Sequence, residues 1–491
     1  MVKKVLVANR SEIACRIFQA CHELGLKTVG IVAPGDEQAR HVTYADEIYP
    51  VTSYLDVASV IEATHKSGAS LVHPGYGFLS ERPLFARAVE KAGLNFIGPT
   101  AESMEALGDK IAAKELAERA KVPTLPWARV SKGGDLKSSA KNVGYPLLLK
   151  ASAGGGGKGM RRVAGESELE AAAESAAAEA QSAFGEGTIF LEKLVENPRH
   201  IEVQVFGDGE GGGVHFFERE CSLQRRHQKV WEEARASHLT EKTREGLFTA
   251  ALSLVREVKY RGAGTLEFLV DAQGGFYFLE MNTRLQVEHT VTELVTGRDL
   301  VHLQIRQGLG EKIKLEAVQA RGHAIEVRIY AEDPSQGFIP TPGTVAQLQW
   351  PTGPGIRVDS GIEAGQKIGT QFDSMLGKLI VYGEDRPQAL ARMRYALDET
   401  LILGVGTNLQ YLRAIADHAA VIDGKVHTQF LEKAFDDFAP IPADAELELI
   451  SALTAQGLGG VRAATTNTSN SGEIEYPSPW QSLSLITGGH A

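Results

Sequence analysis

Short apolar runs alternate with longer amphipathic segments in residues 1–110. The apolar runs are typical of buried strands, and the longer segments place apolar residues at helical spacing. The predicted strands cover residues 3–8, 28–32, 70–72 and 95–99, and the predicted helices cover residues 13–24, 55–66 and 83–92. Alternating strands and helices predict a doubly wound, parallel α/β sheet. No GxGxxG motif follows the first strand, so a dinucleotide site is not indicated.

The pattern changes twice further along the chain. Residues 111–320 contain predicted helices at 111–120, 166–183 and 300–307 and predicted strands at 144–150, 160–163, 188–195 and 201–206. Residues 321–440 are rich in strands with one helix at 387–400, which is typical of an α+β fold. Residues 441–491 are rich in Ala, Ser, Thr, Asn and Gly and are expected to be weakly ordered. We therefore expect domains at 1–110, 111–320 and 321–440, followed by a tail.

Composition narrows the class of protein. The chain has 491 residues, 43% of them apolar and 23% charged, which is an ordinary globular balance. Its net charge of -11, without a block of Lys or Arg, argues against nucleic acid or an anionic membrane as the main partner. The cysteines Cys15, Cys21 and Cys221 show no metal-binding spacing and suit a reducing cytosol. No signal peptide or membrane-spanning run is visible, and we expect a cytoplasmic location.

Residues 276–282 carry acidic and amide groups at the end of an aromatic-rich strand. Side chains alternate in an extended chain, so one face should carry Glu280 and Asn282. The full alternation places Phe276, Phe278, Glu280 and Asn282 on one face and Tyr277, Leu279 and Met281 on the other.

A second strand over residues 264–270 lies just upstream, and a four-residue loop over 272–275 would pair Asp271 with Phe276. That register sets Glu267 opposite Glu280. Two adjacent carboxylates repel each other unless a cation lies between them, and with an amide oxygen they suit Mg²⁺. The alternative is an exposed hairpin end whose acids are only solvated.

Four consecutive glycines at 154–157 follow the strand that ends in Lys150 and precede Lys158. Their backbone N–H groups are free to cradle phosphate oxygens between two cations. The loop is not a Walker loop, because GxxxxGK[ST] is absent. A flexible linker is the alternative, although linkers rarely lie between two strands.

Two further segments carry candidate chemistry. Residues 73–81 follow the third strand, where ligands collect in open parallel sheets, although an ordinary tight loop is equally compatible. In residues 218–229 four cationic or imidazole side chains cluster near the end, which suggests anion contacts or, alternatively, a solvated face.

Taken together, residues 1–440 resemble biotin carboxylase, of the ATP-grasp superfamily. The resemblance rests on the order and spacing of Ala8-Asn9-Arg10-Ser11-Glu12-Ile13-Ala14, residues 73–81, the glycine loop, Glu192-Lys193, Arg225-Arg226-His227-Gln228-Lys229, residues 280–288, and Arg328 before Ala331-Glu332-Asp333-Pro334. The chain departs from the family at Ser11, where glycine is usual, and at Ala153 and Lys158, where glycine and arginine are common. None of these changes removes a group that the chemistry requires.

The resemblance implies that ATP and bicarbonate form carboxyphosphate and that its carbon dioxide carboxylates N1 of biotin on a carrier protein. It implies an N-terminal pre-ATP-grasp domain, a central ATP-grasp domain with a lid at about 125–195, and a C-terminal biotin carboxylase domain. The implied nucleotide residues are Lys110, Lys150, Gly156 and Gly157 at the phosphates, Glu192, Lys193, Leu194 and Val195 at adenine, and His200, Gln224 and His227 beside them. The implied metal ligands for Mg²⁺ or Mn²⁺ are Glu267, Glu280 and Asn282. The implied bicarbonate and biotin residues are Lys229, Arg284, Gln286 and the Val287 backbone, Glu288 as base, Arg328 at the biotin oxygen and Tyr76 at the biotin ring.

The resemblance also bears on partners. There is no Ala-Met-Lys-Met biotinylation sequence, so the biotin carrier and the carboxyltransferase are expected on other chains. Acetyl-, propionyl- and methylcrotonyl-CoA carboxylases share this component, and the first of these serves fatty acid biosynthesis. Family members are commonly homodimers that use the helix of Arg16 and Glu23, and the tail around residues 478–483 is a candidate docking segment.

Two alternatives stay open. Another ATP-grasp enzyme, either a carboxylate–amine ligase or one that forms carbamoyl phosphate, would share the metal carboxylates and the lid. Arg328 and residues 225–229 favour the biotin interpretation. A catalytically inactive nucleotide-binding scaffold is the second alternative, and the complete set of cations, base and metal ligands argues against it.

Overall fold

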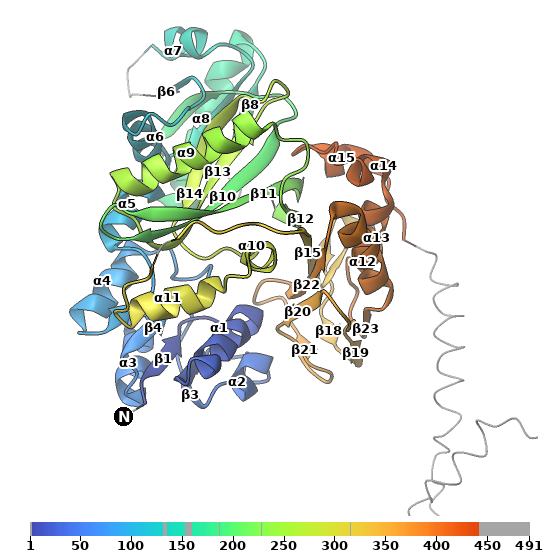
Figure 1. Ribbon diagram of the computed structural model, residues 1–491. Coiled ribbons are helices and arrows are strands. Elements are labelled where there is room, and N and C mark those ends of the chain that lie inside the picture. The colour runs from blue at the N-terminus through green and yellow to red at the C-terminus, as the bar shows by residue number, and fades with distance from the viewer. Residues whose placement is uncertain are drawn as a thin grey trace, which may run out of the picture. The chain divides into compact units, whose positions relative to one another are not determined.

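The N-terminal sheet is parallel throughout, with strand order β3-β2-β1-β4-β5 (Figure 1). The computed structural model describes residues 2–130, 135–152, 160–185, 187–226, 228–314 and 316–440. The strands are β1 (Lys4–Val7), β2 (Lys27–Val32), β3 (Glu47–Pro50), β4 (Leu71–His73) and β5 (Asn95–Phe96). The helices are α1 (Ser11–Glu23), α2 (Arg40–Tyr44), α3 (Val57–Ser67), α4 (Pro83–Lys91) and α5 (Ala101–Gly108). The doubly wound parallel sheet is confirmed.

A second, eight-stranded sheet is antiparallel and has the order β14-β13-β10-β11-β12-β15-β22-β20. Its strands are β10 (Arg199–Asp208), β11 (Gly213–Arg225), β12 (Gln228–Ala234), β13 (Arg261–Val270), β14 (Phe276–Asn282), β15 (His323–Tyr330), β20 (Ile356–Ser360) and β22 (Met375–Gly383). Since β12 pairs with β15, one sheet continues across residue 320, where the sequence predicted a domain boundary.

Helices cover and connect these sheets. α9 (Glu241–Glu257) packs on β10 and β11 through an apolar core that includes Leu247 and Leu254. α11 (Leu300–Gly308) lies between α1 and β13, and α10 (His289–Thr296) packs on β15 and β22 (Figure 1). Because α10 begins directly after residue 288, the segment that carries the predicted bicarbonate residues ends at a helix anchored to the sheet.

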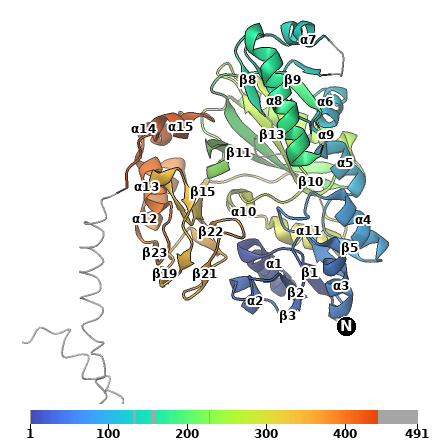
Figure 2. The same ribbon diagram turned by 180° about the vertical axis from the view of Figure 1, so that it is seen from behind.

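A third sheet, with order β6-β9-β7-β8, belongs to the segment predicted to be a lid. It contains β6 (Trp127–Arg129), β7 (Leu147–Ala151), β8 (Arg161–Val163) and β9 (Ile189–Lys193), with α6 (Lys110–Arg119) before it and α7 (Leu136–Val143) and α8 (Glu166–Phe184) within it. Figure 2 shows α8 lying over this sheet.

The remaining elements belong to the C-terminal region. They are β16 (Glu332–Asp333), β17 (Ile339–Pro340), β18 (Gly343–Thr344), β19 (Gln347–Gln349), β21 (Lys367–Ile368), β23 (Leu401–Leu403), a 3-10 turn at Pro334–Gln336, and helices α12 (Arg386–Asp398), α13 (Leu409–Asp417), α14 (Ala419–Ile422) and α15 (Phe430–Ala434). The compact unit ends at Phe438. No helix among the described residues is long and apolar enough to cross a bilayer.

The hairpin between β13 and β14 keeps the predicted pairing of its acids but not the predicted turn. Glu267 lies opposite Glu280, which confirms that register. At the turn, however, Val270 pairs with Phe276, so the expected pair of Asp271 with Phe276 is wrong. Asp271 lies in the turn instead, where its carboxylate accepts backbone N–H groups. The turn is thus one residue longer than predicted.

A β-bulge reconciles the longer turn with the confirmed acid pair. Leu279 has no partner on β13, and the alternation of faces is interrupted at that residue. Phe276 and Phe278 therefore pack in the same apolar cluster as Met281, and not beside Glu280 as predicted. The expected assignment of the aromatic residues to the acidic face is wrong, because a bulge cannot be read from alternation alone.

Candidate active site

A cavity of about 820 Å³ lies between the eight-stranded sheet and the sheet β6-β9-β7-β8 of the predicted lid, which is called the lid sheet below. Its volume is within the range of pockets that hold a whole ligand. The sequence-predicted residues that line it are Lys110, Lys150, Glu192, Lys193, Leu194, Val195, His200, Gln224, Lys229, Glu267, Glu280, Asn282, Arg284, Gln286, Val287, Glu288 and Arg328. Residues distant in sequence, from α6 to β15, thus face one space.

Three carboxylates form a row across adjacent strands of the sheet. Glu280 on β14 lies opposite Glu267 on β13, and Glu267 lies opposite Glu202 on β10. Arg219 on β11 continues the row beside Glu202. Burial, and next the charge of Glu267, raise the pKa of Glu280. Glu280 Oε2 lies 3.9 Å from Lys110 Nζ, which is a long ion pair. The Glu280 end of the row is therefore short of positive charge.

Lys229 is the cation at the centre of the site. Its Nζ donates to Glu202 Oε2 at 2.6 Å, to Glu267 Oε1 at 2.8 Å and to Glu288 Oε1 at 2.7 Å. Burial alone would lower the pKa of Lys229, but these three carboxylates hold it well above its usual value. The ammonium therefore stays charged, and it connects the predicted metal acid to the predicted base.

Glu288 lies between two cations at the start of α10. Its second oxygen accepts from Arg328 Nη2 at 3.0 Å, and Arg328 Nε donates to Glu232 Oε1 at 2.6 Å. Although burial opposes ionisation, Lys229 and Arg328 hold the pKa of Glu288 well below its usual range. Burial raises the pKa of Glu232 to about 8 despite the Arg328 charge. Glu288 is thus ionised and able to accept a proton.

Arg219 is fully buried beneath the site and orients Gln286. Its Nη2 donates to Gln286 Oε1 at 2.7 Å, and its Nη1 donates to Thr292 Oγ1 at 2.9 Å. Because the amide oxygen of Gln286 is taken by Arg219, the amide nitrogen faces Glu267 Oε1, at 2.9 Å. The guanidinium also pairs with Glu202 and donates to Gln204 Oε1 at 2.7 Å and to Thr265 Oγ1 at 3.3 Å.

Arg284 reaches both the metal-type residues and the N-terminal domain. Its Nη2 donates to Asn282 Oδ1 at 3.0 Å, and its Nε lies 3.2 Å from Glu81 Oε2. Asn282 in turn donates its amide nitrogen to Glu267 Oε1 at 2.8 Å. The two carboxylates are therefore stronger candidates for metal ligands than the Asn282 oxygen, which is engaged with Arg284.

The opposite end of the cavity is formed by the lid sheet. Glu192 is almost completely buried and pairs with both Lys150 and Lys114. These two cations lower the pKa of Glu192 against the effect of burial. Both lysines contact the Glu192 carboxylate, so Glu192 does not bind a ligand through that group. Its contribution is to hold Lys150 in position at the cavity.

Three further side chains complete this end. Lys110 is the first residue of α6, which Asp109 caps by accepting from the Ala112 N–H at 2.7 Å. His200 Nδ1 lies 2.9 Å from Gln224 Nε2, and its Nε2 lies 3.2 Å from Glu267 Oε2. A helix N-terminus with a lysine suits phosphate, and the imidazole connects that end to the acids.

Family descriptions match nearly the whole described chain. "Biotin carboxylase, N-terminal domain" matches residues 1–104, "Carbamoyl-phosphate synthase L chain, ATP binding domain" matches 109–316, and "Biotin carboxylase C-terminal domain" matches 326–433. A biotin carboxylase of Pseudomonas aeruginosa is 48% identical over 444 residues, covering 88% of this chain and 98% of that protein. The chain belongs to the biotin carboxylase family.

Two other relatives extend the comparison. The alpha subunit of methylcrotonoyl-CoA carboxylase of Dictyostelium discoideum is 41% identical over 500 residues, covering 98% of this chain and 70% of that protein. The biotin carboxylase domain dimer of Hydrogenobacter thermophilus 2-oxoglutarate carboxylase, solved with MgADP, ADP and bicarbonate, has a TM-score of 0.86 and 45% identity, covering 90% of this chain and 100% of that chain. As a member of the biotin carboxylase family, the chain is an ATP-dependent ligase.

One of the residues that the biotin carboxylase resemblance implied is not in this wall, and three are not described. Gly156, Gly157 and His227 lie outside the described residues. Tyr76 does not line the cavity and packs against the apolar cluster around α1. Its backbone oxygen accepts from Asn9 Nδ2 at 2.7 Å. The structure thus brings together those described residues that the resemblance assigns to the nucleotide, the metal and bicarbonate, but not Tyr76.

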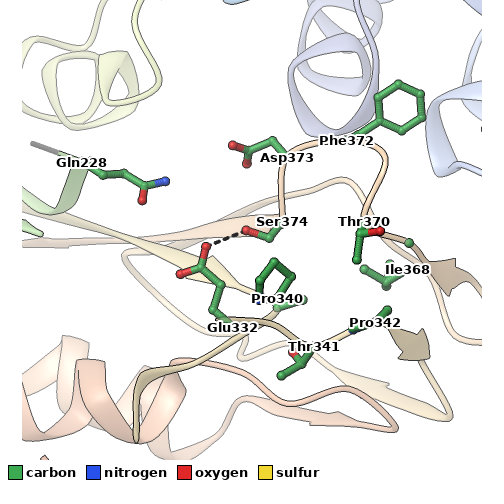
Figure 3. A pocket seen from close by; sticks show the side chains of 12 residues that line it. Gln228, Glu332, Pro340, Thr341, Pro342, Ile368, Thr370, Phe372, Asp373 and Ser374 are labelled. Carbon is green, nitrogen blue, oxygen red and sulfur yellow. Dashed lines mark hydrogen bonds between the residues drawn. The ribbon is translucent and has the colours of Figure 1, made fainter. Parts of the chain in front are cut away.

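A smaller cavity of about 210 Å³ adjoins the site near β16 and β17 (Figure 3). Its wall contains Glu332, which accepts from Ser374 Oγ at 2.7 Å and pairs with Arg225. Gln228, next to Lys229 in sequence, lines both cavities. The carboxylate in this wall is therefore already satisfied by protein groups.

Sequence reasoning missed several groups of the site. Glu202 carried a readable signal, since His200, Glu202 and Gln204 alternate with apolar residues on one strand. Arg219 and Glu232 carried none, because a charged residue within a strand does not reveal which partner it meets. Those pairings depend on strand order, which local patterns do not specify.

Proposed function

We propose that the chain carboxylates biotin that is attached to a separate carrier protein, with ATP and bicarbonate as the other substrates. The observation that carries this proposal is the position of Lys229, whose ammonium contacts both Glu267 and Glu288 in one cavity. Acids suited to a metal on ATP and a base suited to bicarbonate thus lie within reach of one cation.

The nucleotide end supports ATP. Lys110 and Lys150 bring positive charge to the side of the cavity that residues 192–195 also line. Phosphoryl transfer needs this neutralisation along the phosphates. Gly156 and Gly157, with the rest of the segment at about 125–195, are proposed to close over the phosphates and exclude water.

The acid row supports a divalent cation. The raised pKa of Glu280, caused by burial and next by the charge of Glu267, supports a cation beside the Glu280 carboxylate. Mg²⁺ or Mn²⁺ would be held by these two carboxylates, and Asn282 would complete the set through its amide oxygen. When bound, the ion neutralises negative charge on the transferring phosphate.

Glu288 and its neighbours support activation of bicarbonate. An oxygen of bicarbonate attacks the γ-phosphorus of ATP, ADP leaves, and Glu288 accepts the bicarbonate proton, giving carboxyphosphate. Lys229, Arg284, Gln286 and the Val287 backbone would hold the anion, because they offer donors along one side of the cavity.

Arg328 supports the second step. Carboxyphosphate breaks into carbon dioxide and phosphate, biotin N1 loses its proton to that phosphate, and N1 bonds to the carbon. The negative charge that develops on the biotin ureido oxygen needs a fixed cation. Arg328 is held by Glu232 and Glu288 and lines the cavity. Tyr76 is proposed to approach the biotin ring from the N-terminal domain.

We infer an acyl-CoA as the final acceptor. Relatives that match 98% of this chain, including its C-terminal residues, are alpha subunits of methylcrotonoyl-CoA carboxylases. A biotin carrier and a carboxyltransferase would be the partners. Residues 441–491, which lie outside the described residues, are proposed to dock these partners. Acetyl-CoA and propionyl-CoA are the alternative acceptors, the former serving fatty acid biosynthesis.

A cytoplasmic homodimer is proposed as the working form. Arg16 is buried and pairs with Glu293 at 3.2 Å and with Asp299 at 2.5 Å. Glu23 remains partly exposed on the same helix and meets His302 at 2.9 Å. A subunit contact on α1 would therefore use Glu23 directly, with Arg16 supporting the helix from within.

The test is ATP cleavage followed as ADP release with free biotin. We expect release to depend on bicarbonate and to rise when biotin is added. Activity on an amine or ammonia, without stimulation by biotin, would overturn the proposal in favour of another ATP-grasp ligase. Supplying a biotinylated carrier and carboxyltransferase with acetyl-, propionyl- or methylcrotonyl-CoA then identifies the acceptor.

A further inference from the structure

Lys378 is a completely buried lysine that does not line the active-site cavity. It lies on β22, opposite Arg328 on β15. Its Nζ donates to the backbone oxygen of Val287 at 2.7 Å. A strand of the C-terminal region thereby contacts the segment that carries the proposed bicarbonate residues.

The charge of Lys378 is maintained by acids from other elements. Its Nζ lies 3.7 Å from Glu12 Oε1 on α1 and 3.7 Å from Asp359 Oδ2 on β20. Burial alone would lower the pKa of Lys378, but Glu12, Glu326 and Asp359 raise it. A buried ammonium costs several kcal/mol unless such partners offset the lost hydration. The lysine is therefore a charged donor directed at one carbonyl.

That carbonyl belongs to the peptide bond that joins Val287 to Glu288. A peptide unit is planar, so fixing its oxygen also fixes the N–H and the Cα of Glu288, the atom from which its side chain leaves the backbone. Glu288 is the residue that precedes α10, and its side chain makes no capping bond to that helix. The hydrogen bond from Lys378 supplies an orientation that the helix end does not.

We propose that Lys378 is a positioning residue for bicarbonate activation, acting through the Val287–Glu288 peptide. This inference rests on the proposed roles of Val287 and Glu288. A side chain placed about 1 Å from its productive position can lower a rate by about a hundredfold, so a fixed peptide has catalytic value. Although burial opposes ionisation, Arg357 and Lys378 lower the pKa of Asp359, so Asp359 is the ionised partner that holds the lysine in place, and it does not touch substrate.

The alternative is a purely structural role for Lys378 in the packing of β22. The neighbours Leu379 and Ile380 belong to apolar clusters. A structural role predicts a lower stability of the fold and equal losses of kcat/KM for bicarbonate and for ATP. A positioning role predicts a loss confined to the bicarbonate step.

The decisive variant is Lys378→Met in the full chain, which keeps the length of the side chain but removes the donor. We expect the KM for bicarbonate to rise and kcat for bicarbonate-dependent ATP cleavage to fall, together by about tenfold or more in kcat/KM, while ADP affinity changes less than about threefold. Lys378→Arg keeps a charged donor and should recover part of the loss. Unchanged bicarbonate kinetics in folded Lys378→Met would overturn the proposal, as would equal losses for bicarbonate and nucleotide.

Two controls separate the possible failures. If Lys378→Met does not fold, the double variant Glu12→Gln/Lys378→Met, which also removes the unpaired acid, is measured in its place against Glu12→Gln alone. The wild type and Glu288→Gln are assayed in parallel. If ATP cleavage by the wild type does not depend on bicarbonate, the proposed function itself is contradicted. If the wild type depends on bicarbonate and the kinetics of Lys378→Met are the same as those of the wild type, only this inference is contradicted.

Discussion

Lys229 Nζ lies 2.7 Å from Glu288 Oε1, so the proposed base is paired with the cation proposed to receive its substrate. The same ammonium contacts Glu267 at 2.8 Å. An anion that binds to Lys229 must share it with these carboxylates. Since the lysine charge is a main cause of the low pKa of Glu288, weakening this ion pair makes Glu288 a stronger base. Substrate binding and base activation are thereby coupled.

Glu288→Gln should abolish proton transfer without disturbing the nucleotide end. We expect bicarbonate-dependent ATP cleavage to fall by about a hundredfold or more, because a positioned base contributes that much. Binding of ADP, measured by calorimetry, should change little. Glu233→Gln is the matched control, since Glu233 is a buried acid on β12 that pairs with His323 and Arg386 away from the cavity. Lost nucleotide binding in Glu288→Gln would contradict the assigned role.

Glu280→Gln should weaken the binding of Mg²⁺ but stabilise the fold in the absence of divalent ions. The pKa of Glu280 is raised by burial and by Glu267, so its ionised form destabilises the fold as pH rises through that pKa. Removing the charge should raise the melting temperature measured without divalent ions. The Mg²⁺ concentration for half-maximal activity should rise by about tenfold or more. A variant that melts lower and needs no additional Mg²⁺ would show that the acid pair is not a cation site.

Arg219→Met should destabilise the protein strongly, because it removes the buried donor to Glu202 Oε1 and to the amide oxygen of Gln286. Breaking a buried pair on one side costs about 3–5 kcal/mol, which denaturant unfolding can measure. The exposed pair of Arg87 with Glu105 provides the comparison, and Arg87→Met should cost much less, because a solvent-exposed ion pair contributes little to stability. The double variant Glu202→Gln/Arg219→Met should recover part of the loss. Equal costs at the two arginines would contradict this account of the buried row.

Stability should fall as pH rises from about 6.5 to about 8. Burial raises the pKa of Glu12 to about 8 and of Glu326 to about 7, so the folded state binds their protons more tightly than the unfolded state in this window. The buried histidines His73 and His289, with pKa values lowered by burial to about 3, act in the opposite sense but only below their ordinary value of 6.5. Melting temperatures at the two ends of the window measure the slope.

Glu12→Gln should make that slope shallower, since it removes one of the titrating acids. Glu47→Gln, which replaces a partly exposed acid of the same N-terminal sheet that pairs with Lys4, should leave the slope unchanged. A slope that is identical in wild type and Glu12→Gln would mean that Glu12 is ionised throughout the window.

Most strands and helices of the N-terminal domain were predictable because each pattern is local. Short apolar runs and helical periodicity identified β1, β2, β4 and β5 and the helices α1, α3 and α4, whereas β3, α2 and α5 were not predicted. The helices α9 and α10 were not predicted, since their apolar residues are interspersed with Thr and Glu. The bulge at Leu279 was also missed, because one extra residue leaves composition and turn signals unchanged.

The sequence by itself determined the chemical inventory of this protein: the paired acids of β13 and β14, the cations around them, and the family to which their order and spacing belong. Only the tertiary structure decided which of these residues contact one another. Strand order places Glu202 and Arg219 in line with Glu267, and packing directs Lys378 at Val287. The physical reason is the difference in sequence separation over which the two kinds of interaction act. Periodicity and turn chemistry act over a few residues, whereas the charge on a buried group is set by partners that sheet pairing brings from distant parts of the chain.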